Sequence, residues 1–186
     1  MSELLLFNKP FGVISQFRES PHGDTLEKFI DVPDVYPAGR LDKDSEGLLL
    51  LTGDGALQTR IAHPSAKMAK TYWVQVEGTP TIDQLSTLRT GVDLKWGRTR
   101  PAQVREIPPP GLPARVPPVR HRKNQPTHWL AITLSEGKNR QIRQMTASVE
   151  LPTLRLFRTS IGPWSTDGLL PGQWSSICVN LPKQRR

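Results

Sequence analysis

Residues 39–51 read Gly-Arg-Leu-Asp-Lys-Asp-Ser-Glu-Gly-Leu-Leu-Leu-Leu, and this stretch combines the two patterns that decide how the chain folds. Its second part, residues 48–51, is a short apolar run bounded by Gly47 and Gly53, which is typical of a buried β-strand. Its first part crowds charged side chains into the loop that precedes this strand. A carboxylate in such a loop, for example Asp42, can serve as a nucleophile, a general base or a metal ligand. A polar turn held by local hydrogen bonds explains the same pattern without catalysis.

The pair Asp42 and Asp44 also suits a magnesium site, because carboxylates bind the Mg²⁺ of many phosphotransferases. In haloacid-dehalogenase-type sites, however, the apolar strand precedes such a pair, whereas here it follows. The single Cys178 can form neither an intrachain disulfide nor a cysteine-based metal site. No histidine pair has the spacing of metal ligands; the four histidines are His22, His63, His121 and His128. Ligand spacing therefore disfavours a metal site, and the pair Asp42 and Asp44 leaves the magnesium interpretation as an alternative.

Strands and helices follow in irregular order, which predicts an α+β fold on a largely antiparallel sheet. Apolar or alternating runs predict further strands at residues 4–7, 72–77 and 129–134. Four capping residues predict helices that begin after them, namely Asp24, Asp54, Thr81 and Asn139. The apolar residues expected on the buried faces of the last three helices are Leu57 and Ile61; Ile82, Leu85 and Leu88; and Ile142, Met145 and Val149.

Positive charge is concentrated in one part of the chain. The formal net charge is +8, and residues 98–143 hold ten Lys or Arg against two acidic residues, so the remainder of the chain is neutral. Residues 108–126 contain seven prolines and therefore predict an extended loop; its cations are Arg115, Arg120, Arg122 and Lys123. Such a stretch suits a polyanion, either a nucleic acid or an anionic membrane, although a solvated basic loop without a partner gives the same pattern.

A membrane partner is disfavoured, because the sequence has no apolar run of about 18 residues and no basic helix with a broad apolar face. The N-terminus lacks the basic segment of a signal peptide, so we expect a cytoplasmic location.

Two further motifs carry candidate site residues. Lys70-Thr71-Tyr72 opens a predicted strand, on which Tyr72 is either a core residue or an aromatic ring that stacks on a nucleobase. Residues 136–143 read Glu-Gly-Lys-Asn-Arg-Gln-Ile-Arg and place Arg140 and Arg143 at i and i+3 of a predicted helix. Cations near a helix N-terminus do not favour its dipole, so these arginines suit a negative partner, either phosphate or a carboxylate such as Asp42.

In this order, the motifs resemble the RsuA/RluB/RluE/RluF family of ribosomal RNA pseudouridine synthases, and the match runs through almost the whole chain. Residues 6–10, Leu-Phe-Asn-Lys-Pro, resemble the opening strand and turn of that family. Residues 39–48 resemble its catalytic motif, which is a highly specific string. Residues 70–72 resemble its second motif and residues 136–143 its third.

The resemblance implies a role for each matching residue. Asp42 becomes the essential aspartate, Tyr72 the ring that stacks on the target base and assists proton transfer, and Arg143 the ion-pair partner of Asp42. Arg40 takes the space that the flipped base leaves. The residues expected to bind RNA are Arg40, Lys70 and Arg140, together with the four loop cations Arg115, Arg120, Arg122 and Lys123.

The implied chemistry is isomerisation of uridine to pseudouridine without a cofactor. The aspartate attacks the base, attacks the sugar or removes the 2′ proton; the sequence leaves these three routes open. The implied fold is an α+β catalytic core with a mixed, largely antiparallel sheet, flanking helices and a central RNA-binding cleft. A base inside a helix must be extruded to react, and a stacking ring offsets part of that cost.

Most members of the family carry an N-terminal S4 RNA-binding domain, whereas here the catalytic strand begins at Leu4. Together with residues 152–156 and the Pro/Arg-rich loop, this makes the RluE subgroup the nearest resemblance. The expected substrate is 23S ribosomal RNA, either free or within an assembling large ribosomal subunit. We expect one catalytic domain over residues 1–186, with room for two closely packed subdomains. The oligomeric state stays open, and a monomer is compatible with the sequence.

A non-catalytic RNA-binding protein on the same fold is the main alternative. Such a protein would keep the basic loop but would not need Asp42, Tyr72 and Arg143 together.

Overall fold

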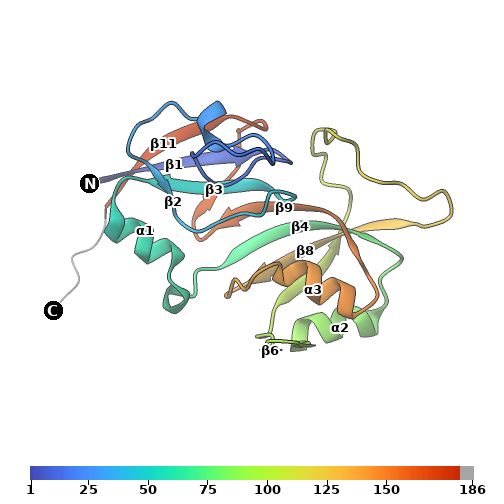
Figure 1. Cartoon of the computed structure of the whole chain (residues 1–186). Helices are drawn as coiled ribbons and strands as arrows, with labels where there is room; N and C mark the ends of the chain where they lie inside the picture. Colours follow the sequence, from blue (N-terminus) through green and yellow to red (C-terminus); the bar gives the residue numbers. More distant parts are fainter. Residues whose placement is uncertain (181–186) are drawn as a thin grey trace. The chain divides into compact units, whose positions relative to one another are not determined.

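The computed structural model of the chain describes residues 1–180 (Figure 1). The chain divides into two compact units, and each has its own part of the β-structure. Unit 1 comprises residues 1–66 together with the segment that starts at residue 164, and unit 2 comprises residues 67–163.

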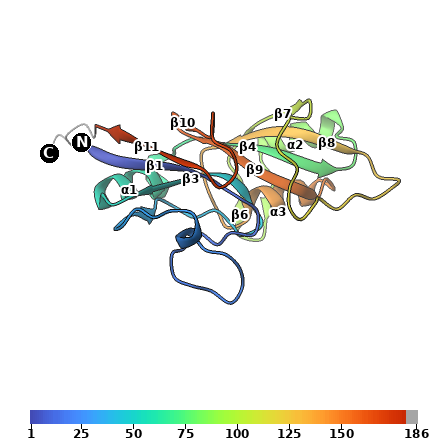
Figure 2. The same ribbon diagram turned by 90° about the horizontal axis from the view of Figure 1, so that it is seen from above.

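In unit 1, strand β1 (Ser2–Lys9) lies between β11 (Trp174–Val179) and β3 (Glu46–Thr52) and is antiparallel to both (Figure 2). The short strand β2 (Tyr36–Pro37) also pairs with β3. The remaining elements of the unit are helix α1 (Gly55–Ala62), the 3₁₀ turns η1 (Leu26–Lys28) and η2 (Pro64–Ala66), and the short strand β10 (Trp164–Ser165). The strands predicted at residues 4–7 and 48–51 are therefore confirmed.

The leucine run of β3 is continuous because every residue of this strand is buried. Leu51 lies opposite Leu5 and Leu49 lies opposite Phe7, so these four side chains share one apolar cluster. Full burial of a leucine side chain contributes about 1.5–3 kcal/mol, so this cluster holds the strand firmly in its register.

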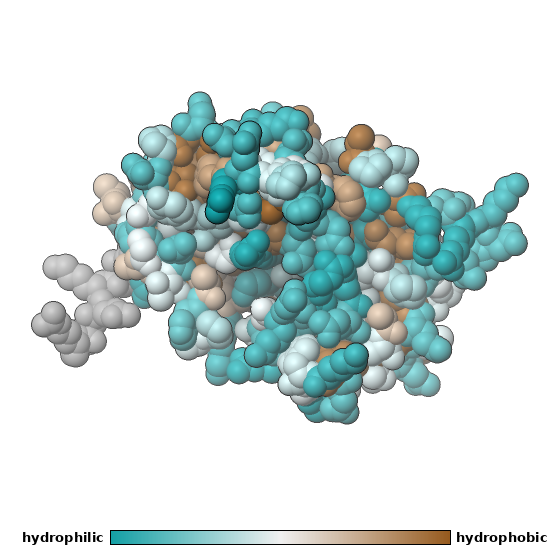
Figure 3. Space-filling model, viewed as in Figure 1, coloured by the Kyte–Doolittle hydropathy of each residue, from teal (hydrophilic) through white to brown (hydrophobic). Residues whose placement is uncertain are grey.

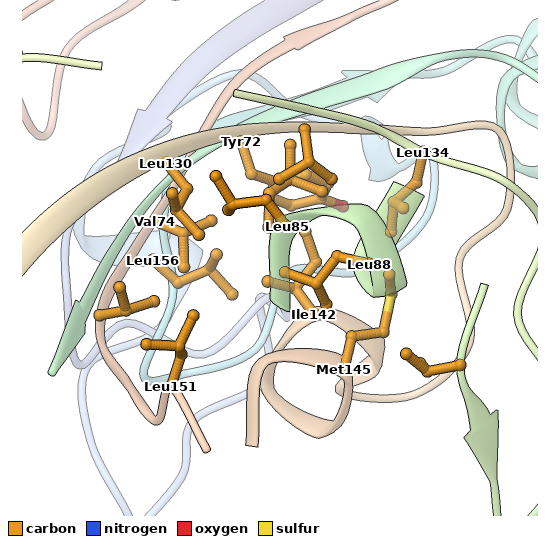
Figure 4. Close-up of a cluster of buried hydrophobic side chains, with 14 residues drawn as sticks. Tyr72, Val74, Leu85, Leu88, Leu130, Leu134, Ile142, Met145, Leu151 and Leu156 are labelled. Carbon is orange, nitrogen blue, oxygen red and sulfur yellow. The ribbon is translucent and has the colours of Figure 1, made fainter. Parts of the chain in front are cut away.

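In unit 2, four antiparallel strands follow the order β9 (Thr153–Ile161), β4 (Lys70–Glu77), β8 (Thr127–Leu134) and β7 (Gln103–Ile107). Helices α2 (Ile82–Thr90) and α3 (Gln141–Ser148) pack against this sheet. Figure 4 shows their apolar side chains, among them Leu88 and Met145, directed into one cluster with Val74 and Leu130 of the strands. A separate hairpin is formed by β5 (Asp93–Leu94) and β6 (Gly97–Arg98).

Two helix starts are as predicted. Asp54 accepts hydrogen bonds from the backbone N–H groups of Ala56 and Leu57 at the start of α1. Thr81 and Gln84 form the predicted capping box of α2, and Gly91 ends that helix. Leu85 and Leu88 are buried as expected, but Ile82 is 83% exposed and its place in the buried stripe was wrongly predicted.

The other two helix predictions need correction. The segment after Asp24 forms only the single 3₁₀ turn η1, which has no side-chain cap, and the Asp24 carboxylate accepts from the Lys28 ammonium at 2.7 Å. Helix α3 is capped by Arg140 in a left-handed conformation, with φ of 51°, and not by Asn139. Arg140 therefore precedes the helix, and the predicted i, i+3 pairing of Arg140 with Arg143 on one helical face is wrong.

Candidate active site

The loop that carries Asp42 is a tight turn at the start of β3. The Ser45 N–H donates to the Asp42 carbonyl at 3.0 Å, which closes a β-turn over residues 43 and 44. Before the turn, the Ser15 hydroxyl donates to the Leu41 carbonyl at 2.6 Å and accepts from the Leu41 N–H at 3.3 Å. The polar-turn interpretation is thus correct for the backbone, and the turn leaves the Asp42 side chain half-buried.

Lys9 holds the other side of this turn. Its side chain is fully buried, and its ammonium donates to the carbonyls of Pro10 and Val13 at 2.9 Å and to that of Lys43 at 3.5 Å. The Gly12 N–H also donates to the Lys43 carbonyl, at 2.8 Å. A buried ammonium is tolerated only where oxygen atoms replace its water, so Lys9 joins residues 9–13 rigidly to the loop that carries Asp42.

In unit 2, Tyr72 is a core residue, which is the first of the two interpretations that the sequence left open. Its ring belongs to the cluster shown in Figure 4, together with Leu85 and Ile142, and only 9% of the residue is exposed. Its hydroxyl forms no hydrogen bond within residues 1–180, yet it is not one of the fully buried polar atoms that lack a partner. The ring is therefore held by packing, while the hydroxyl end reaches the surface of the unit, and stacking of the ring on a base stays a prediction.

Lys70 begins the same strand and is half-buried. Its ammonium donates to the Met68 carbonyl at 3.2 Å. Burial lowers the pKa of Lys70 below its ordinary value, and the nearby Arg158 guanidinium lowers this pKa further. Arg158 is itself 4% exposed and lies opposite Tyr72 in the register of β4 and β9. Two cations and the tyrosine thus occupy neighbouring positions at this end of the sheet.

Within unit 2, the third motif (residues 136–143) and the second (residues 70–72) contribute to the same apolar cluster. Ile142 of α3 packs in the same cluster as Tyr72, so the neighbouring Arg143 lies on the helix that covers Tyr72 and is half-buried. Arg140 is exposed just before the helix. Asp42 and Arg40 belong to unit 1, so the ion pair of Asp42 with Arg143 stays a prediction.

The four loop cations differ in their surroundings. Arg115 donates from three guanidinium nitrogens to the carbonyls of Pro117, Leu154 and Pro118, at 2.9, 3.3 and 3.2 Å, and so fixes the loop itself. Arg122 and Arg120 approach the Glu77 carboxylate to 3.2 and 4.0 Å.

Lys123 is exposed near the tip of this loop. Figure 3 shows a mainly hydrophilic surface at the right of the view, where Figure 1 draws the segment in yellow.

Sequence reasoning missed the residues that support these groups. Lys9 and Ser15 position the Asp42 loop, and Glu77 anchors the basic loop. The sequence could have indicated Lys9, because residues 6–10 resemble the opening strand and turn of the family. Nothing in the sequence marks Ser15 or Glu77.

One pocket of unit 2 lies apart from the predicted site residues. In unit 2, a pocket of about 370 Å³ is lined by residues such as Ile107, His128 and Trp129, and none of the predicted site residues lines it. Among residues 1–180, no cluster of three or more His, Cys, Asp or Glu is arranged to hold a metal ion. No helix in that range is long and apolar enough to cross a membrane.

Comparison with known proteins identifies the class. Residues 3–148 match the RNA pseudouridylate synthase family, and the chain belongs to that family. A crystal structure of a pseudouridylate synthase has a TM-score of 0.78 and 27% identity, covering 96% of this chain and 71% of that one. A chain from an H/ACA RNP bound to a substrate RNA has a TM-score of 0.62 at 14% identity and shares the fold alone.

Closer relatives carry a more specific name. The ribosomal large subunit pseudouridine synthase E of Xanthomonas axonopodis pv. citri (strain 306) is 59% identical over 171 residues, which cover 90% of each chain. The protein of the same name from Vibrio vulnificus (strain CMCP6) is 54% identical over 177 residues, covering 95% of this chain and 76% of the relative. The α+β fold, the enzyme class and the resemblance to the RluE subgroup are thereby confirmed.

Proposed function

We propose that this enzyme converts a uridine of the 23S RNA of the large ribosomal subunit to pseudouridine, with Asp42 as the essential carboxylate. The proposal is supported by the names of the relatives that are more than half identical to the chain. It also draws on the concentrated positive charge of residues 98–143, which suits an RNA substrate. Ribosomal RNA is made in the cytoplasm of bacteria, so the enzyme acts there, on free RNA or on an assembling subunit.

The observation that carries the assignment of Asp42 is the way its loop is fixed. Ser15 binds the backbone before Asp42, and Lys9 binds the backbone after it, so the carboxylate is held in one place without being fully buried. A nucleophile or general base needs this combination, because the side chain must reach the substrate while its position stays fixed.

Tyr72 and Arg143 serve the same reaction. The ring of Tyr72 stacks on the extruded uracil, and its hydroxyl assists proton transfer. Arg143 keeps the Asp42 carboxylate ionised, since an opposite charge favours the charged form. The glycosidic bond of the uridine breaks, the uracil rotates, and its C5 atom bonds to the sugar, so atoms balance without a cofactor.

Beyond the reacting base, Arg40 enters the space it vacates, and Lys70 and Arg140 contact the RNA backbone. Of the loop cations, Arg120, Arg122 and Lys123 contact phosphates, while Arg115 keeps the loop in shape.

The test is Asp42→Asn, assayed by mapping pseudouridines in ribosomal RNA from cells that lack the gene and carry either version. We expect the wild type to restore one pseudouridine in 23S RNA and Asp42→Asn to restore none. The control is Asp31→Asn, which changes an exposed carboxylate of the same unit and should restore the modification fully. Turnover by purified Asp42→Asn would contradict the assignment, and loss of wild-type activity in EDTA would favour the magnesium interpretation.

A further inference from the structure

Unit 2 carries a second cationic surface, which none of the assigned roles uses. The turn of the β5–β6 hairpin exposes Trp96, of which 37% is accessible. The ammonium of Lys138 stands over the ring of Trp96, 5.7 Å from its centroid. Lys95, Arg98 and Arg100 are exposed on the same segment. We call these five residues the hairpin patch.

The positive charge of the hairpin patch is largely uncompensated. Within residues 1–180, no carboxylate lies within 4.0 Å of the charged groups of Lys95, Arg100 or Lys138. Arg98 pairs with Asp93 at 2.9 Å, but both side chains are more than half exposed, and such surface pairs are weak. The patch therefore presents several cations around one aromatic ring.

Polar contacts hold the patch in a fixed arrangement. Beyond the hairpin, the Thr99 N–H donates to the Val92 carbonyl and the Val92 N–H donates to the Thr99 hydroxyl oxygen, both at 2.9 Å. Glu136 accepts from the Arg100 N–H at 2.8 Å, which ties the hairpin to the segment that carries Lys138. Glu136 also accepts from the Gln141 side chain at 2.7 Å, at the start of α3. In Figure 1 the hairpin accordingly lies beside α2 and α3.

These features match the chemistry of single-stranded nucleic acid. An exposed indole offers a face on which an unpaired base stacks, and surrounding cations neutralise the phosphates on either side of that base. An acidic protein segment would use the cations, whereas each nucleotide of a single strand uses both features, its phosphate binding the cations and its base stacking on the ring. We propose that the hairpin patch binds a single-stranded RNA segment, with one unpaired base stacked on Trp96 and phosphates bound by Lys95, Arg100 and Lys138. The proposal rests on the proposed function in one respect, which is that the polyanion is RNA.

The experiment measures the Kd of the whole chain for an oligouridylate of about 12 nucleotides, within the usual span of one small binding domain, and for an RNA duplex of the same length. Trp96→Leu keeps an apolar side chain but removes the ring, whereas Trp96→Phe keeps a ring. Lys138→Gln removes one cation. The control is Lys28→Gln, which alters a comparable contact in unit 1, where the Lys28 ammonium stands 5.9 Å from the Phe29 ring centroid.

We expect Trp96→Leu to raise the Kd for oligouridylate about tenfold and to leave the Kd for the duplex unchanged, because paired bases offer no free face. Trp96→Phe should retain most of the affinity. Lys138→Gln should weaken binding of both RNAs and lower the log–log salt slope for the single strand by about 0.7. Lys28→Gln should match the wild type.

Unchanged oligouridylate binding by Trp96→Leu would overturn the proposal, and so would an equal loss in Trp96→Phe. An acidic peptide that binds the patch while Trp96→Leu leaves RNA affinity intact would assign it to a protein partner instead. Pseudouridine formation by the wild type is measured in parallel. Its absence would count against the proposed function but would leave the binding comparison valid, because that comparison requires no turnover.

Discussion

Replacing Glu77 by glutamine should release the basic loop of residues 108–126 from the sheet. Glu77 is the last residue of β4, and its side chain is 8% exposed. It lies 3.2 Å from a guanidinium nitrogen of Arg122 and 4.0 Å from one of Arg120. Because the loop has no strand pairing of its own, it is held by these ion pairs, by the contacts of Arg115, and by hydrogen bonds to the carbonyls of Pro113 and Pro126.

The magnitude follows from the exposure of the partners. Both guanidinium groups are more than half exposed, and pairs of this kind contribute roughly 0.2–1 kcal/mol each. The buried carboxylate places these pairs near the upper end of that range. Glutamine keeps the hydrogen bond from Arg122 through its amide oxygen, so the change should cost about 1 kcal/mol. That value corresponds to about a fivefold increase in the population of the open loop.

Limited digestion with trypsin measures this population, because the loop offers cleavable bonds after Arg120, Arg122 and Lys123. When opening and closing are fast, the cleavage rate follows the open population, so Glu77→Gln should be cut about five times faster. The control is Glu106→Gln, whose carboxylate is half exposed and lies 3.8 Å from His128. An unchanged cleavage rate for Glu77→Gln would refute the role of Glu77 as an anchor.

Three further predictions concern unit 2. Tyr72→Phe should bind RNA normally but slow single-turnover isomerisation by about 10²–10⁴-fold, whereas a wild-type rate would leave the ring only a packing role. Lys70→Met should raise the melting temperature, because burial and Arg158 disfavour the charged lysine. The same lowered pKa means that the unfolded chain binds more protons than the folded one at alkaline pH. Wild-type stability should therefore rise with pH towards 10.5, and Lys70→Met should lack that rise in pH-dependent urea denaturation. Thr81→Ala should lose about 0.5–2 kcal/mol in the same assay, whereas Thr90→Ala at the other end of α2 should lose less.

Elements with strong local signals could be predicted from the sequence. The leucine run of β3 is apolar at every position because the strand is fully buried, and no distant contact is needed to recognise it. The capping box of Thr81 and Gln84 is equally local, since both of its hydrogen bonds close within four residues. The motif at residues 39–48 was recognised by its resemblance to the family's catalytic motif, and recognition required no knowledge of what holds the loop.

Features that depend on distant partners could not be predicted. The sequence shows Glu77 only as a residue of a predicted strand, because its partner Arg122 lies 45 positions away along the chain. The start of α3 was misplaced for a related reason. Asn139 is a favourable capping residue by type, but Gln141 binds Glu136 and accepts from the Lys138 N–H, so the turn closes one residue later. The choice between neighbouring capping positions was thus made by side-chain contacts that residue preferences do not encode.

Two positions of unit 2 that work against stability lie in the predicted second and third motifs. Arg140 adopts a left-handed backbone with φ of 51°, which costs a residue other than glycine of the order of 1 kcal/mol. It also places a cation at the N-terminus of α3, where the helix dipole disfavours positive charge. Lys70 is half-buried beside a second cation, Arg158. A sequence selected for stability alone would place glycine at the first position and an apolar residue at the second. Both positions belong to the residues proposed to bind RNA, and an anionic RNA backbone beside them would favour their positive charges.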